Sequence, residues 1–371
     1  MLDRRAEARV YARWKRGLFL LDIALTAALL GGLVASGLHQ SVRLWVSARI
    51  PAIWPLQVAA YTTVLWLGMT AASFPLDWFG SFALEHRFNL STQRLTEWLT
   101  DYAKHLALGS GLGLLLVEGL SLLLRSFPTT WWIWAAIFWM GWSAFLARIL
   151  PTWLIPIFYK QRPLADENLR QRLASFVARC GARVEGVYEV NLSRTTRKAN
   201  ACLCGLGKTR RVLVSDTLLQ THPPEEVEVV LAHEVGHHQL HHIGILLGVG
   251  TAAAALSFFA VDGVSRLLFA RTGVTGIADL AALPLLALGL FAANLVLMPA
   301  TNGVSRLLEA QADRFALQQT QNPQAFIATM RRLADQNLSE IEPPTWVEWL
   351  LYDHPPIAKR IALAQRYGGG A

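Results

Sequence analysis

The sequence has few charged residues for its length. Charged side chains make up only 16% of the 371 residues, whereas apolar side chains make up 53%. Soluble globular domains carry about 25% charged residues, so this chain lacks the charge needed to cover a water-exposed surface of its size. The composition argues against an ordinary soluble protein and indicates a membrane protein.

Cysteine is also scarce. The chain has three cysteines, Cys180, Cys202 and Cys204, and an odd number cannot pair completely. We place all three on the cytoplasmic side of a membrane, where thiols stay reduced. Cys202 and Cys204 have the spacing of half a metal site, but no second cysteine pair is present to complete one. The sequence therefore predicts reduced thiols and no cysteine-ligated metal.

Acidic residues are too few to balance the basic ones, and the formal net charge is +8. Such a charge suits either nucleic acid or a membrane surface as a partner. The basic residues are scattered and flank apolar segments instead of forming one stripe, which argues against nucleic acid. Membrane topology and anionic lipid explain the charge better, so we expect a lipid bilayer and no nucleic acid as partners.

Apolar runs long enough to span a bilayer are abundant. A shorter apolar run, 149–159, contains Pro151 and Pro156 and is interpreted as a broken extension of the span before it. The first apolar core is too long for a signal peptide and further spans follow it, so we expect an uncleaved anchor. Glu118 lies inside the third span, where a carboxylate is costly and is by default a functional hypothesis. The six candidate spans are 17–38, 50–76, 106–124, 129–147, 243–261 and 280–300.

The distribution of arginine and lysine predicts an orientation. Six basic residues between positions 4 and 16 precede the first span and place the N-terminus in the cytoplasm. Six crossings then place 75–105, 160–242 and 301–371 on the same side. The Ala-, Leu- and Arg-rich composition is typical of bacterial proteins, so we expect a bacterial inner membrane with these three segments on its cytoplasmic side.

The segment between the fourth and fifth spans reads as a small α/β unit. Helical spacing covers 166–180, short strands are expected at 187–190 and 211–214, and a further helix at 223–242. We therefore predict a mainly α, polytopic membrane fold with about six to seven transmembrane helices and a small α/β domain. The predicted regions are 1–159, with about four spans, and 160–371, which contains the α/β unit and is interrupted by the spans at 243–261 and 280–300.

The predicted helix at 223–242 contains the pattern H-E-x-x-H. His233 and His237 are four residues apart, so both imidazoles lie on one helix face and can bind one Zn²⁺. Glu234 lies beside the metal, where it can accept a proton from an activated water. Only this histidine pair has a carboxylate at the second position. The remaining histidines are interpreted as interfacial or solvated: His238, His241 and His242.

A catalytic zinc site needs a third protein ligand and an open position. Glu309 and Asp313 are four residues apart on a predicted helix and share a face. We expect Glu309 to bind the metal and Asp313 to accept the outer N–H of a ligand histidine. The alternative is an ordinary amphipathic helix in which Arg306 and Arg314 form ion pairs with these acids.

Together these motifs resemble the type I CAAX prenyl endopeptidases, membrane zinc proteases of the gluzincin group that mature prenylated proteins. That family pairs H-E-x-x-H with E-x-x-x-D across two intervening membrane spans, as this chain does. The similarity runs from about Pro75 to Leu363. Further matching segments follow in the family's order: 85–92, 155–160, 198–201, 205–209, 215–219 and 353–361.

The resemblance implies roles for further residues. Asn200 and Ala201 are expected on an edge strand that pairs with the substrate backbone, and His354 is expected to help hold the developing oxyanion. Arg360 is expected to brace its own segment, with a surface helix cation as the alternative. The family commonly has an aromatic residue after the Asn-Ala pair, and this chain has Cys202 there, which puts the preference of that pocket in doubt.

These features predict a zinc metalloendopeptidase with one Zn²⁺ per chain. Its substrates are expected to be peptides or proteins, with prenylated C-termini as the class that the resemblance implies. A membrane quality-control protease that degrades misfolded membrane proteins is the alternative. A non-catalytic zinc-binding membrane scaffold is a third reading, against which Glu234 argues because a structural site needs no base beside its metal.

Overall fold

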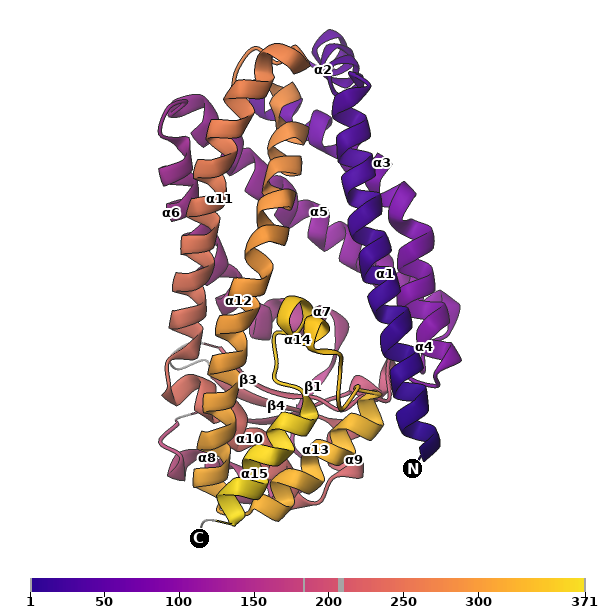
Figure 1. Cartoon of the computed structure of the whole chain (residues 1–371), viewed down its shortest axis with the longest axis vertical. Coiled ribbons are helices and arrows are strands. Elements are labelled where there is room, and N and C mark those ends of the chain that lie inside the picture. The colour runs from indigo at the N-terminus through magenta and orange to yellow at the C-terminus, as the bar shows by residue number, and fades with distance from the viewer. Residues whose placement is uncertain (1, 183, 206–209, 370–371) are drawn as a thin grey trace.

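The computed structural model describes residues 2–182, 184–205 and 210–369. Positions 206–209 of the 205–209 segment therefore lie outside the described residues. Long helices form the upper part of the molecule, and a small sheet with shorter helices forms its lower end (Figure 1). Both termini lie at that lower end.

The N-terminal region consists of long helices that follow the predicted apolar spans. The second span, predicted within 50–76, overlaps α3, which begins at Trp54 and ends at Trp78. The turn between α1 and α2 depends on Gly37, whose φ of 72° lies in the left-handed region that favours glycine. The helices are α1 (Leu2–Ala35), α2 (Leu38–Arg49), α3 (Trp54–Trp78), α5 (Leu95–Ser126) and α6 (Trp131–Ile149).

Short irregular helices end two of these spans. A π-helical turn (Phe79–Ala83) and α4 (Leu84–Arg87) follow α3. A second π-helical turn (Leu150–Leu154) and α7 (Ile155–Phe158) continue α6. Pro151 lies in that turn and has no N–H to donate, so the regular hydrogen-bond ladder of the helix is interrupted there. The run 149–159 is thus a broken extension of the fourth span, as predicted.

The lower end contains a four-stranded sheet in the order β1-β2-β4-β3. Strand β2 pairs parallel with β4, while β1 and β3 pair antiparallel with their neighbours, which leaves β3 at an edge. One buried cluster joins this sheet to α8, α10 and α13 and includes Leu173, Val212, Leu231 and Phe326. The strands are β1 (Gln161–Pro163), β2 (Gly186–Val190), β3 (Ala201–Cys204) and β4 (Arg211–Ser215).

The remaining helices connect this sheet to a long helical hairpin. The hairpin consists of α11 (His242–Thr272) and α12 (Leu283–Thr320), which lie side by side in Figure 1. Both helices extend beyond the predicted spans, which are 243–261 and 280–300. The first turn of the second span, Leu280–Ala282, is a 3₁₀ helix that precedes α12. The other helices are α8 (Glu167–Arg179), α9 (Asp216–Thr221), α10 (Pro224–Gln239), α13 (Pro323–Asn337), α14 (Thr345–Leu351) and α15 (Ile357–Gly368).

Five helices among the described residues are long and apolar enough to cross a membrane by length and composition. The predicted second span, α3, has 25 residues but is not one of these five. The mainly helical, polytopic fold with a small sheet is confirmed. The five stretches are Arg4–Ala35, Leu95–Ser126, Trp131–Phe158, His242–Thr272 and Leu280–Thr320.

The loop between α4 and α5 lies against the sheet domain. The Arg197 amide donates to the Leu90 carbonyl (2.8 Å), and the Thr92 amide donates to the Thr195 carbonyl (3.2 Å). These bonds place the first cytoplasmic loop of the predicted topology beside the segment that leads into β3. The bonds join two of the segments that the sequence predicts to lie on the same side of the membrane. That this is the cytoplasmic side stays a prediction.

Candidate metal centre

Two of the predicted metal ligands lie on α10. Pro224 occupies the first turn, where its missing N–H costs nothing, and Glu225 and Glu226 also lie there, where acids interact favourably with the helix dipole. His233 and His237 follow on one face, with their Nε2 atoms 3.2 Å apart. The spacing of the sequence motif thus produces the convergence that one metal ion requires.

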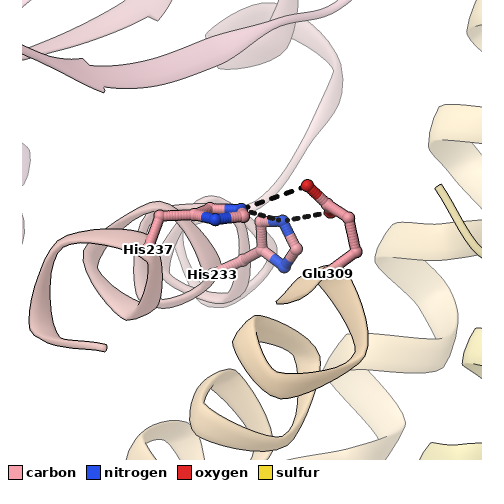
Figure 2. A group of neighbouring side chains, drawn as sticks. All are labelled: His233, His237 and Glu309. Atoms are coloured by element: carbon pink, nitrogen blue, oxygen red, sulfur yellow. Dashed lines mark hydrogen bonds and ion pairs between the residues drawn. The ribbon is translucent and has the colours of Figure 1, made fainter. Parts of the chain in front are cut away.

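Helix α12 brings the third predicted ligand to the same point. The Oε2 atom of Glu309 lies 3.1 Å from Nε2 of His233, and its Oε1 atom lies 3.3 Å from Nε2 of His237. One ligand atom from each of the three residues lies within 4.8 Å of the others. Figure 2 shows the two imidazoles and the carboxylate pointing toward one another.

Close packing of α10 against α12 makes this approach possible. A Cβ atom at Gly236 would lie 3.3 Å from the Cα of Ala312 and 3.2 Å from the ring of Phe315. Glycine therefore lets the two backbones come closer than any larger residue would. Because Gly236 precedes His237 directly, the packing contact and the metal ligand are fixed together.

The outer nitrogen of His233 is held by a buried ion pair. Nδ1 of His233 lies 3.0 Å from Oδ1 of Asp313, whose Oδ2 accepts from Nε of Arg360 at 2.8 Å. Burial alone lowers the pKa of His233, but hydrogen bonds to Asp313 and Glu309 outweigh burial and raise the pKa to about 9. The surroundings of His233 therefore favour a positive charge.

The donor set fits a divalent metal such as zinc. In a neutral His233 whose Nδ1 donates to Asp313, Nε2 carries a bare lone pair that faces the carboxylate of Glu309. The buried Oε2 of Glu309 then has no hydrogen-bond donor among the described residues. Two acceptors 3.1 Å apart repel each other unless a second proton or a metal ion lies between them. Two histidines and one glutamate are the ligand set of several catalytic zinc sites, which keep a fourth position open.

The predicted catalytic residues surround the same point. A cavity of about 240 Å³ is lined by Glu234 and His354 together with Asn200 and Ala201. His354 lies between α14 and α15, and its Nε2 is 3.3 Å from Oε1 of Glu309. Its Nδ1 is 2.8 Å from Oδ1 of Asp353, and this bond raises the pKa of His354. The structure therefore brings all the predicted site residues to one cavity or to its immediate supports.

The open edge of β3 is narrower than the sequence predicts. The Asn200 carbonyl accepts from the Ser215 amide at 3.0 Å and so faces β4. Because antiparallel strands alternate in the direction of their backbone groups, those of Ala199, Ala201 and Leu203 face the open edge. The expectation that Asn200 also offers its backbone to substrate needs this revision.

Side chains already occupy two of those three outward-facing positions. Asn337 accepts from the Ala199 amide (2.9 Å) and donates to the Ala199 carbonyl (3.2 Å). His238 Nε2 lies 2.9 Å from the Leu203 carbonyl. Only Ala201 keeps both its N–H and its C=O open to the edge among the described residues, so the available pairing surface is one residue long.

One prediction and two of the alternatives drawn from the sequence alone are wrong. His242 is not a solvated or interfacial histidine: it is fully buried, with Nδ1 3.0 Å from Nδ1 of His237. The alternative of ion pairs between Arg306 and the α12 acids also fails, because Arg306 donates to the backbone carbonyls of Glu348 and Tyr352. The alternative of a surface cation at Arg360 fails as well, since only 12% of that side chain is exposed.

Sequence reasoning missed His242, Asn337 and the role of His238. A position five residues after His237 gives no helix-face signal, and Asn337 lies 138 residues from the backbone that it contacts. Segment 85–92 was a usable signal, because Glu85 pairs with Lys198 just before β3 (2.9 Å). Glu118 lies half-buried on α5 and is not among the described residues that line the cavity at the metal centre.

Comparison with known proteins agrees with this geometry. Residues 163–367 match peptidase family M48, and residues 3–160 match the family described as CAAX prenyl protease N-terminal, five membrane helices. The chain is 30% identical over 365 residues to a Bacillus subtilis protein named uncharacterized metalloprotease YhfN, an alignment that covers 97% of this chain and 85% of that one.

More distant relatives carry the CAAX prenyl protease name. The probable CAAX prenyl protease 1 of Schizosaccharomyces pombe is 26% identical over 308 residues, which cover 81% of this chain and 65% of that protein. The chain thus spans slightly less than two thirds of that relative. The crystal structure of S. mikatae Ste24p superposes with a TM-score of 0.86 over 98% of this chain and 89% of that one, at 22% identity, and shares the fold.

The fold and the His-His-Glu group define a membrane metalloprotease. The chain belongs to peptidase family M48.

Proposed function

We propose that the protein is an integral-membrane zinc endopeptidase that binds one Zn²⁺ through His233, His237 and Glu309. The observation that carries this proposal is the meeting of three elements at one cavity: the His-His-Glu group, the carboxylate of Glu234 and the open edge at Ala201. A structural zinc site closes all four positions with protein ligands. Three ligands beside a cavity with a base suit catalysis instead.

Glu234 acts as general base and then as general acid in this proposal. When bound, the zinc ion supplies a Lewis acid that polarises the scissile carbonyl and lowers the pKa of a water molecule. Glu234 lines the cavity together with His233, and there it accepts the proton from the attacking water and delivers it to the leaving amine. His354 reaches the same cavity from the other side, where its Nε2–H donates to the oxyanion.

The substrate backbone pairs with Ala201 by strand addition. Asn337 blocks pairing at Ala199, and His238 blocks the carbonyl of Leu203, so the bound peptide pairs at Ala201. Pairing at this position holds the peptide beside the metal centre, which makes the attack effectively intramolecular. Asn200 contributes its side chain, which lines the cavity.

We infer that prenylated C-terminal peptides are one substrate class, because relatives that share the membrane helices carry the CAAX prenyl protease name. Degradation of misfolded membrane proteins is the second candidate. A larger cavity of about 650 Å³ supports membrane-derived substrates of either kind, because it shares Leu333, Asn337, His354 and Arg360 with the cavity at the metal centre and reaches Phe19 on α1.

We propose that the chain lies in a bacterial inner membrane with its N-terminus and metal centre on the cytoplasmic side. Six basic residues of α1 before the first span support this orientation. We also propose a boundary near residue 160, with the N-terminal spans in 1–159 and the peptidase in 160–371. The hairpin of α11 and α12 interrupts the latter region.

The deciding experiment is cleavage of a farnesylated CAAX peptide by purified, zinc-quantified protein, with Glu234→Gln as the matched variant. We expect one zinc per chain in both proteins and a loss of roughly 10²–10⁴-fold in kcat for the variant, which is the contribution of a general acid–base group. Full activity in Glu234→Gln contradicts the mechanism. If the zinc-loaded wild type leaves the peptide intact, unfolded membrane proteins are the next substrate, and failure there supports a non-catalytic scaffold.

A further inference from the structure

His242 is buried at the junction of the peptidase domain and the membrane hairpin. It is the first residue of α11, directly after the turn at His241 (φ 58°), and its exposed fraction is 0%. Its Nδ1 lies 3.0 Å from Nδ1 of His237, and its Nε2 lies 3.0 Å from Oε1 of Gln311 on α12. Both nitrogens of a fully buried imidazole are therefore engaged, one by a metal ligand and one by a neighbouring helix.

The donor and acceptor properties of these groups determine where the protons lie in the hydrogen-bonded series Gln311, His242 and His237. The Oε1 atom of Gln311 can only accept, so Nε2 of His242 carries the hydrogen. In a neutral imidazole, Nδ1 of His242 then has a lone pair and accepts from Nδ1–H of His237. His237 is thereby left with a bare Nε2, which is the atom that faces Glu309 at 3.3 Å.

The opposite polarity is incompatible with a metal ligand. If His242 donated from Nδ1, Nδ1 of His237 would accept and its Nε2 would carry the hydrogen. That hydrogen would point at the other two ligands and leave His237 no lone pair for a metal. Metal binding therefore requires that His237 donates to His242 and that His242 donates to Gln311.

We propose that His242 is a positioning residue that holds His237 in its metal-binding tautomer and orientation, with Gln311 fixing the tautomer of His242. This inference rests on the proposed metal centre. Metal-ligating histidines generally donate their outer N–H to a carboxylate, carbonyl or water, and a second imidazole performs that task here. Because His242 begins α11 and Gln311 lies on α12, the membrane hairpin itself sets the geometry of one ligand.

The two positions differ in exposure, which ranks the expected effects. His242 is fully buried, so water cannot replace its lone pair when the imidazole is removed. Gln311, the last side chain in this hydrogen-bonded series, is exposed, so water can partly replace its carbonyl. Loss of His242 is therefore expected to weaken zinc binding more than loss of Gln311.

The test is the zinc dissociation constant of the full-length protein, measured by competition with a chromogenic chelator. We expect His242→Phe, which keeps the volume but has no acceptor, to bind zinc about 10–100-fold more weakly. His242→Gln keeps a carbonyl acceptor and is expected to recover most of the affinity. His241→Asn is the matched control, because it changes the exposed neighbouring histidine and asparagine tolerates a positive φ.

A second readout separates positioning from general damage. In ¹⁵N-histidine-labelled, zinc-loaded wild type, the Nδ1 nitrogen of His237 is expected to carry the proton, and in His242→Phe that resonance is expected to shift or broaden. If His242→Phe does not fold, Gln311→Leu at its exposed position takes its place, with an expected loss of a few-fold. Unchanged zinc affinity in both variants, with a normal wild-type site, overturns the inference. Failure of the wild type to bind zinc contradicts the proposed function instead.

Discussion

The two histidines of the metal centre are supported in opposite ways. The Nδ1 atom of His233 is held by a charged pair: it lies 3.0 Å from Asp313, which also accepts from Arg360 at 2.8 Å. The Nδ1 atom of His237 is held by an uncharged imidazole, that of His242, at 3.0 Å. Both supports are buried, since Asp313 is 1% and His242 is 0% exposed.

The two supporting side chains differ in the free energy that their burial costs, because one is charged and the other is neutral. A buried charge needs a partner, so Asp313 requires Arg360 from α15, and losing either partner leaves the other unpaired. A neutral imidazole needs only hydrogen bonds, which α10 and α12 supply. The charged support therefore ties the metal centre to overall stability, whereas the neutral support affects mainly ligand geometry. Each prediction below tests this contrast or its limits.

The largest effect is expected at Glu309, which faces both histidines. Glu309→Ala removes a proposed ligand whose carboxylate lies near both Nε2 atoms. The zinc affinity is therefore expected to fall by more than the 10–100-fold that is typical of residues behind a ligand, and little zinc should remain after dialysis. Metal analysis of the purified protein measures the stoichiometry. Arg314→Ala, an exposed change on the same helix, is the control and should keep its zinc. Equal zinc in both variants would move the third ligand elsewhere.

The next largest effect separates the two supports. Asp313→Ala is expected to lower the free energy of unfolding by about 3–5 kcal/mol, because it strands a buried Arg360, and to weaken zinc binding as well. His242→Phe should weaken zinc binding with a much smaller change in stability. Thermal unfolding of the metal-free proteins in detergent, beside chelator competition, measures both quantities.

A double variant sharpens this result. Arg360→Met added to Asp313→Ala removes the stranded charge, so stability is expected to recover while zinc affinity stays low. If stability does not recover, the loss in Asp313→Ala came from packing and not from an unpaired arginine. If zinc affinity recovers too, Asp313 does not act through the orientation of His233.

The sequence was sufficient for the parts of the site that depend on local geometry. Residues four apart on a helix share a face whatever surrounds them, so His233 with His237 and Glu309 with Asp313 follow from spacing alone. Apolar length predicts the membrane helices for the same reason. These features depend on a single element, and the structure agrees with the predicted positions.

The remainder depends on how separate elements meet. His242 is buried only because α11 starts after a left-handed turn and packs beside α12, and no periodic pattern encodes that contact. The restriction of the open edge to Ala201 requires the β3–β4 register and a side chain from α13. Span ends were also inaccurate, since α12 continues unbroken to Thr320 and carries the proposed ligand Glu309 beyond the apolar stretch.

A third histidine, His354, has an exposed support and is therefore expected to depend on it least. His354 is supported by Asp353, and both side chains are more than half exposed, at 54% and 66%. The hydrogen bond to Asp353 raises the pKa of His354, with burial acting in the opposite direction. A raised pKa keeps the imidazole protonated, and able to donate to an oxyanion, up to a higher pH; that contribution is lost as the pH rises through the pKa.

Asp353→Asn is therefore expected to move the alkaline limb of kcat/KM to lower pH without changing zinc content. The shift should be small, because solvent screens an exposed pair far more than it screens Asp313 and Arg360. Profiles across the neutral and alkaline range measure it, with Glu342→Gln as an exposed carboxylate control. An unchanged limb would mean that His354 does not act through its protonated form. A large shift in the profile of kcat, which reports the enzyme–substrate complex, would mean that the bound peptide excludes water from this pair, so that all three histidines work in a dry site once substrate is bound.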